Sequence, residues 1–252
     1  MRSLAVVVSL LALTATSQAH VRHKHRATAA RTTTPVASTR RAERHTEPRD
    51  TTDGQSIGQP WSGRLREATK LEEGDGYVIR RPYRAYGTAT TVSLVEQVIT
   101  SIRAKYPDNH VLAIGDISAE HGGPITEHHS HQSGRDIDVG LFYNEKPRGY
   151  PESFVTATSS NLDCEATFAL LSAFADTSRV NGGAQIIFLD YDVQGLLYNW
   201  AIDHGVGVER LERLFQYPKG RSSSDGLVRH FPNHDNHMHV RFKCNNDDGG
   251  CR

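Results

Sequence analysis

The stretch HMHVRF at residues 237–242 decides how this chain folds, because it predicts a strand with two chemically different faces. Side chains two apart on a strand share a face, so His237 and His239 lie together, with Arg241 on the same side. The opposite face is apolar and consists of Met238, Val240 and Phe242. Such a strand needs a hydrophobic core on one side and leaves the other side for polar chemistry.

The stretch EHHSHQSGRDIDVG at residues 127–140 predicts a second strand of the same kind, far upstream in the chain. Asp136 and Asp138 alternate with apolar residues and therefore share one face. The opposite face consists of Ile137 and Val139. A Gln-Ser-Gly turn precedes this strand and lets the chain reverse, so that His131 and Asp138 converge.

The rest of the pattern predicts one α+β domain, in which helices flank a central antiparallel sheet and the site lies in a groove on that sheet. Helical spacing and capping residues predict helices at Val92–Tyr106, Asp163–Phe174, Gln194–His204 and Val208–Phe215. Short apolar runs predict strands at His110–Ile117, Asp136–Phe142, Ala184–Leu189 and His237–Phe242. The polar run Lys219–Gly226 predicts a loop positioned to act as a flap. Neither a GxGxxG turn nor a nucleophile elbow occurs.

Histidine is concentrated at residues 127–140 and 229–242, which together hold seven of the chain's 14 histidines. Imidazole and carboxylate are ligands that Zn²⁺ accepts. Two histidines and one carboxylate leave a fourth tetrahedral position for water, which is the pattern of catalytic zinc. Because Asp136 and Asp138 share a strand face, their spacing alone lets either carboxylate bind the metal.

Residues 1–19 predict a signal peptide. They combine the basic residue Arg2, the apolar run Leu4–Leu13 and a small-residue cleavage site ending at Ala19. The apolar run is too short to cross a bilayer, and no later segment approaches a membrane span. We therefore expect an exported protein whose mature form has no membrane span.

Residues 20–54 predict a disordered basic linker. The segment His20–Asp50 carries eight Lys or Arg against three acidic residues and almost no large apolar side chain. The folded domain is expected at residues 55–245, followed by a short tail at 246–252. The chain's net charge of zero thus combines a basic segment with a mildly acidic domain, which argues against a nucleic-acid partner. The basic segment has the charge to contact an anionic surface such as a cell wall.

Three cysteines, Cys164, Cys244 and Cys251, allow at most one disulfide and leave one thiol. Pairing Cys244 with Cys251 would close the end of the chain, whereas pairing Cys164 with Cys244 would tie a helix to the last strand. The sequence does not choose between them. None has the CxxC spacing of a zinc-thiolate site.

Four motifs resemble the penicillin-insensitive murein endopeptidases, which are periplasmic zinc enzymes. They belong to the group that also holds lysostaphin-type peptidases, D-Ala-D-Ala peptidases and the hedgehog signalling domain. The motifs are QSIG at 55–58, IGDIS at 114–118, HHSHQSGRDIDV at 128–139 and HDNHMHVRF at 234–242. They span most of the predicted domain. The family's cysteine pairs are not all present, so its disulfide pattern is not transferred.

The resemblance implies a role for each matched position. The implied zinc ligands are His131, Asp138 and His239. The implied catalytic residues are His237, beside the metal, and the further active-site histidines His128 and His234. Asp136 would then either orient a ligand histidine or be a solvated strand residue, and Arg241 would either hold a substrate carboxylate or pair with an acid. Roles at the surface or around the ligands are expected for His121, His129 and His230.

These features predict an exported zinc metallopeptidase, periplasmic or secreted, that acts on peptidoglycan. The resemblance implies cleavage of the bond between D-alanine and meso-diaminopimelate, by a mechanism that β-lactams do not inhibit because no serine is acylated. Two alternatives stay open. One is a zinc D-Ala-D-Ala carboxypeptidase or dipeptidase of the same fold, although such enzymes usually use a glutamate as base. The other is a catalytically inactive zinc-containing module that binds the wall.

Overall fold

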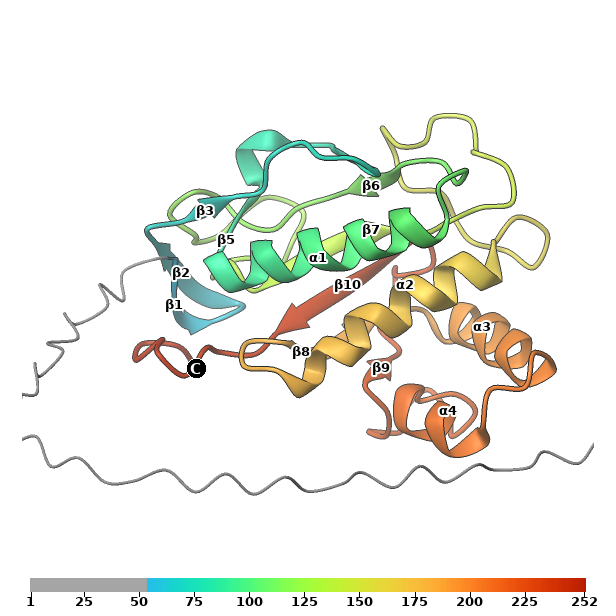
Figure 1. Ribbon diagram of the computed structural model, residues 1–252. Coiled ribbons are helices and arrows are strands. Elements are labelled where there is room, and N and C mark those ends of the chain that lie inside the picture. The colour runs from blue at the N-terminus through green and yellow to red at the C-terminus, as the bar shows by residue number, and fades with distance from the viewer. Residues whose placement is uncertain (1–53) are drawn as a thin grey trace, which may run out of the picture. The chain divides into compact units, whose positions relative to one another are not determined.

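The computed structural model describes residues 54–252, which form a six-stranded sheet with helices α1 (Ala89–Lys105) and α2 (Cys164–Asp176) packed across it (Figure 1). In spatial order the strands are β4 (Tyr77–Ile79), β6 (Leu112–Ile114), β7 (Asp136–Gly140), β10 (His237–Phe242), β8 (Ala184–Phe188) and β9 (Val228–Arg229). The other elements are β1 (Gln55–Gln59), β2 (Ser62–Arg66), β3 (Thr69–Lys70), β5 (Tyr86–Gly87), α3 (Tyr191–Asp203), α4 (Val208–Leu214) and the 3-10 turns η1 (Pro82–Arg84) and η2 (Thr177–Arg179). This confirms the predicted α+β class.

The predicted signal peptide, and all but the last residue of the predicted linker, lie outside the described residues. Within residues 54–252, no helix has both the length and the apolar character needed to cross a bilayer.

The two sequence stretches that carry the histidines meet as neighbouring strands at the centre of the sheet. β7 and β10 are antiparallel, with Asp138 opposite His239 and Asp136 opposite Arg241. Directly opposed residues of an antiparallel pair project from the same face. β10 is also antiparallel to β8, and β7 to β6, so the centre of the sheet is antiparallel as predicted.

The strand at each edge of the sheet runs parallel to its neighbour, which the sequence pattern did not predict. β4 runs parallel to β6, and β9 runs parallel to β8. Parallel neighbours need a long crossover connection. Helix α1 lies in the connection from β4 to β6, and helices α3 and α4 lie in the connection from β8 to β9.

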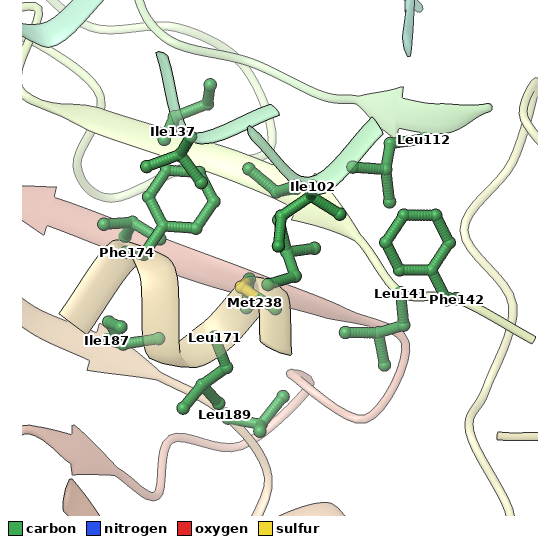
Figure 2. Packing of buried hydrophobic residues seen from close by; sticks show 14 of the residues in the cluster. Ile102, Leu112, Ile137, Leu141, Phe142, Leu171, Phe174, Ile187, Leu189 and Met238 are labelled. Atoms are coloured by element: carbon green, nitrogen blue, oxygen red, sulfur yellow. The ribbon is translucent and has the colours of Figure 1, made fainter. Parts of the chain in front are cut away.

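The hydrophobic core fills the space between the sheet and its covering helices. Met238 on β10 and Ile137 on β7 are fully buried there, with Leu171 and Phe174 of α2 (Figure 2). The predicted alternation of the two strands is thereby confirmed. Burial of each large side chain stabilises the fold by about 1.5–3 kcal/mol, and it fixes which face of β7 and β10 remains for the carboxylates and imidazoles.

Two helix boundaries follow from identifiable caps. The side chain of Asp163 accepts a hydrogen bond from Ala166 N and starts α2 where predicted. Helix α3 begins earlier than its predicted start at Gln194, because the side chain of Asp190 caps it by accepting from Asp192 N. Gly205 follows the end of this helix with a φ of +77°, a conformation that favours glycine.

The hairpin of β1 and β2 was not predicted as a pair of strands, and it holds the end of the chain (Figure 1). Gly58 N donates to Gly250 O at 2.8 Å, and Arg252 N donates to Gly58 O at 3.0 Å. Arg135, which directly precedes β7, donates to Phe242 O and Arg252 O, both at 2.9 Å. The last residues therefore connect the hairpin to the two central strands.

A disulfide between Cys244 and Cys251 closes this end of the chain, one of the two pairings that the sequence left open. We expect Cys244→Ser to lower the free energy of unfolding by about 2 kcal/mol, because the bridge closes a short loop and restricts the unfolded chain. Urea denaturation under non-reducing conditions measures this loss. Cys164→Ser removes the unpaired thiol and is the control, with an expected change within about 0.5 kcal/mol. Equal urea midpoints for both variants and the parent would contradict the prediction.

Candidate metal centre

On the sheet face opposite the core, three imidazoles surround one carboxylate oxygen. Oδ1 of Asp138 lies 3.3 Å from His131 Nε2, 3.3 Å from His239 Nδ1 and 3.6 Å from His237 Nε2. His131 comes from the loop before β7, whereas His237 and His239 come from β10. The fold therefore brings both histidine stretches to one point.

The spacing of these atoms fits a shared cation. His131 Nε2 and Asp138 Oδ1 are buried and make no hydrogen bond within the described residues, an arrangement that is costly for buried polar atoms. Ligand atoms at about 2.0–2.1 Å from a tetrahedral zinc ion lie about 3.3 Å from one another. Asp138 Oδ1 has this separation from one nitrogen each of His131 and His239. The residues present therefore fit a divalent cation with nitrogen and oxygen ligands.

The ring of His131 is held in one orientation by its other nitrogen. Nδ1 lies 3.1 Å from Ile117 O, so it carries the proton and donates it there, and Nε2 is left facing Asp138. The backbone of His131 has a φ of +63°, which costs a non-glycine residue about 1 kcal/mol. Its N–H donates to Asp136 Oδ2 at 3.0 Å, which helps to hold this strained conformation.

The charges of His131 and Asp138 depend strongly on each other. Burial lowers the pKa of His131, but the carboxylates of Asp138 and Asp136 outweigh burial and raise the pKa to about 9. Burial raises the pKa of Asp138, but the imidazoles of His131 and His237 outweigh it and hold the pKa below its ordinary value. A proton on His131 Nε2 and a cation at the same position exclude each other, so metal affinity should fall as the pH falls.

Asp136 connects a candidate ligand histidine to Arg241. Its Oδ1 lies 3.1 Å from His239 Nε2, and Arg241 donates to it from Nε at 2.7 Å and to Oδ2 from Nη2 at 3.2 Å. Burial raises the pKa of Asp136, but His239 and Arg241 outweigh it and hold the pKa well below its ordinary value. Asp136 is thus an ionised carboxylate in contact with both His239 and Arg241. Two roles were left open for Arg241, and in the structure it pairs with an acid.

Asp136→Asn is expected to weaken metal binding about 10- to 100-fold, because the neutral amide no longer orients His239 or holds Arg241. Competition with a chelating dye measures the Kd for zinc. Asp190→Asn is the matched control, since Asp190 is also a carboxylate paired with an arginine and a histidine, Arg221 at 3.6 Å and His230 at 3.4 Å. An unchanged Kd in Asp136→Asn would show that its carboxylate does not support the centre.

Asp116 is a buried carboxylate beside His128, and it was not among the site residues predicted from the sequence. Its Oδ2 lies 3.0 Å from His128 Nε2 and accepts from Arg84 Nη1 at 2.9 Å, while its Oδ1 accepts from Arg81 Nε at 2.8 Å. Burial raises the pKa of Asp116, but hydrogen bonds from His128 and Arg84 outweigh it, so the group stays ionised. The available signal was the motif IGDIS, in which this acid comes two residues after a buried strand.

His237 and His234 are neighbours at the mouth of the centre. The ring of His237 stacks on Phe154 with a centroid distance of 4.6 Å, and its Nδ1 lies 2.6 Å from Asn236 Oδ1. Nε2 therefore faces Asp138. Burial lowers the pKa of His237 to about 4, so its imidazole is neutral at neutral pH and can accept a proton. The ring of His234 lies 4.8 Å from that of His237, between centroids.

His128 and His239 both border the pair of His131 and Asp138. One compact group of potential ligands is His128, His131 and Asp138, whose ligand atoms lie within 4.8 Å of one another. His128 Nε2 lies 3.8 Å from Asp138 Oδ2 but only 3.0 Å from Asp116 Oδ2. His239 Nδ1 lies nearer to Asp138, at 3.3 Å. These distances favour His239 as the third ligand and a position beside the metal for His128.

The centre opens into a cavity of about 380 Å³. Its wall includes residues 127–130, residues 231–234 and Trp61 of the hairpin turn. His129 lines this cavity, whereas His121 and His230 are absent from its wall. The loop at 219–226, expected to act as a flap, does not line the cavity; Arg221 ties it to Asp192 of α3 at 2.7 Å.

Comparison with known proteins found a match between this chain and one protein family. The model of the family described as penicillin-insensitive murein endopeptidase matches residues 56–167. The matched segment contains Asp116, His128, His131 and Asp138, and it ends before β10. No curated protein matches the chain. The match confirms the resemblance drawn from the motifs, and the sheet register adds the histidines of β10 to the same site.

Proposed function

Since this chain belongs, through residues 56–167, to the penicillin-insensitive murein endopeptidase family, we propose that it is a zinc-dependent peptidase that cleaves peptide crosslinks of peptidoglycan. The bond would be the one between D-alanine and the side-chain amine of meso-diaminopimelate. The observation that carries this proposal is the set of imidazole nitrogens around Asp138 Oδ1, at 3.3, 3.3 and 3.6 Å.

His131 Nε2, Asp138 Oδ1 and His239 Nδ1 would hold the metal. Two imidazoles and one carboxylate, without a thiolate, suit zinc in a catalytic rather than a structural site. When bound, zinc supplies a water of lowered pKa and polarises the scissile carbonyl.

His237 would act as the general base. Its Nε2 lies 3.6 Å from the same Asp138 oxygen as the ligand nitrogens, so a water beside that oxygen is within its reach. The neutral imidazole accepts the proton of the attacking water at Nε2. Asn236, 2.6 Å from Nδ1, keeps the other ring nitrogen engaged.

His128 and His234 would share the two remaining roles, donation to the developing oxyanion and donation to the leaving amine. His128 is oriented by Asp116, which lies 3.0 Å from its Nε2. His234 lines the same cavity beside His237. One donor to an oxyanion is typically worth about 3 kcal/mol of transition-state stabilisation.

We further propose that the protein acts outside the cytoplasm, in the periplasm or after secretion. Residues 1–19 have the pattern of a signal peptide. The disulfide between Cys244 and Cys251 fits an oxidising compartment, and the proposed substrate is a component of the cell wall.

Metal analysis coupled to mass analysis of digested peptidoglycan tests the proposal. We expect about one zinc per chain and conversion of crosslinked muropeptide dimers to monomers, with both lost after chelation. Loss of only a terminal D-alanine would identify a carboxypeptidase instead. Binding to murein sacculi without any product would identify an inactive wall-binding module.

A further inference from the structure

Trp61 is exposed at the tip of the β1–β2 hairpin, and yet its position is fixed. Its side chain is 55% exposed. The preceding Pro60 accepts a hydrogen bond from Gln132 N at 3.0 Å, next to the candidate ligand His131. On its other side, the hairpin pairs with the chain end that the disulfide closes (Figure 1). The ring is therefore presented to solvent from a backbone that is held on both sides.

Arg241 links this ring to the metal centre. Its guanidinium carbon lies 5.5 Å from the ring centroid of Trp61 and 5.4 Å from that of Phe188. The same guanidinium is held by two hydrogen bonds to Asp136, which contacts His239. The contacts therefore run from Trp61 at the surface through Arg241 and Asp136 to the candidate metal site.

Phe231 is a second exposed aromatic residue on the same cavity. Its side chain is 51% exposed, and its ring packs edge-on against Phe188, 5.4 Å between centroids. Among the exposed large apolar side chains of the described residues, Trp61 and Phe231 are the two that line this cavity. Exposed aromatic surface at a cavity with polar groups marks a binding surface more often than a structural one.

From this geometry we infer that Trp61 and Phe231 form a subsite for the amino-sugar glycan of the substrate. This inference rests on the proposed function. The peptide stems of murein carry short or charged side chains, which offer little apolar surface to two large rings. The sugar rings of its repeating disaccharide present flat C–H faces, which pack on the face of an aromatic ring, while their polar edges stay in water. The subsite would make the enzyme prefer glycan-bearing crosslinks to free crosslinked peptides.

Trp61→Ala tests this preference in the full chain. We expect its kcat/KM to fall about tenfold on a crosslinked dimer that carries its disaccharides, and less than about twofold on the same dimer stripped of sugar. Trp61→Phe should retain most of the activity on both. Tyr83→Ala is the matched control, because Tyr83 is 65% exposed and contacts an arginine, Arg84 at 5.6 Å, but does not line the cavity. Equal losses of Trp61→Ala on both substrates, or no loss on either, would overturn the inference.

A binding measurement separates this inference from the proposed function. The chain has two tryptophans, Trp61 and Trp200, so the fluorescence of a Trp200→Phe variant reports Trp61 alone. Titration with the free murein disaccharide should change this fluorescence, and Trp61→Phe in the same background should abolish the change. If the fluorescence does not change during the titration, the subsite is wrong even if crosslinks are cleaved. If the free disaccharide binds but no crosslinked dimer is cleaved, the proposed function is wrong and the subsite is still supported.

Discussion

In His131→Ala, purified chain is expected to retain less than about a tenth of the parent's zinc and to lose at least about a thousandfold in crosslink cleavage. The substitution removes Nε2, which lies 3.3 Å from Asp138 Oδ1 at the proposed metal position. Two protein ligands then remain, and one of them, Asp138, loses one of its two nearest imidazoles. Metal content after dialysis and the rate on crosslinked dimers measure the two effects.

The variant should nevertheless stay folded, because the hydrophobic core lies on the other face of the sheet. His121→Ala is the control: His121 is an exposed histidine of the same region that does not line the cavity. We expect parental zinc content and rate from it. Stoichiometric zinc together with the parental rate in His131→Ala would refute the ligand assignment.

The sequence predicted the faces of the central strands well, because the period of two along a strand is a local property. The two sides of β10, with His237 and His239 on one and Met238 on the other, could be read directly, and burial confirms them. The edge strands β4 and β9 were not predicted, since they are three and two residues long and carry no readable period. Their parallel pairing depends on crossovers through helices, which are long-range features.

The choice between Asp136 and Asp138 shows where a single sequence is insufficient. Both carboxylates were correctly predicted to share a face, and spacing alone cannot rank them. Register separates them: Asp138 stands opposite His239, whereas Asp136 stands opposite Arg241. A carboxylate opposite a guanidinium forms an ion pair, and one opposite an imidazole is available to share a metal with it. Strand register is set by the whole sheet, so no local motif contains this information.

Asp116 and Trp61 were missed for a related reason. Trp61 lies far from both histidine stretches in sequence, and Asp116 lies outside them, before the first; both reach the site through the fold, because Asp116 follows β6 and Trp61 sits in a hairpin held by the chain end. The motifs IGDIS and QSIG pointed to the two regions without indicating which side chains face the metal.

His237→Ala should separate turnover from metal binding. We expect parental zinc content, because His131, Asp138 and His239 are untouched, and a fall in kcat of about 10²- to 10⁴-fold, because the proton acceptor is gone. KM should change little, since the base acts in the transition state. Metal analysis and steady-state kinetics on crosslinked dimers give the three values.

Two further variants decide whether His237 acts as a base or only supports the site. His237→Gln preserves much of the side-chain volume against Phe154 but cannot accept the proton, so its kcat should be as low as that of the alanine variant. In His237→Ala, the space left beside Phe154 opens to the cavity, and added imidazole should restore part of the rate. A structural role would instead give recovery with glutamine and none with imidazole. Digestion of crosslinked muropeptides by His237→Ala at the parental rate would show that the water loses its proton to another group.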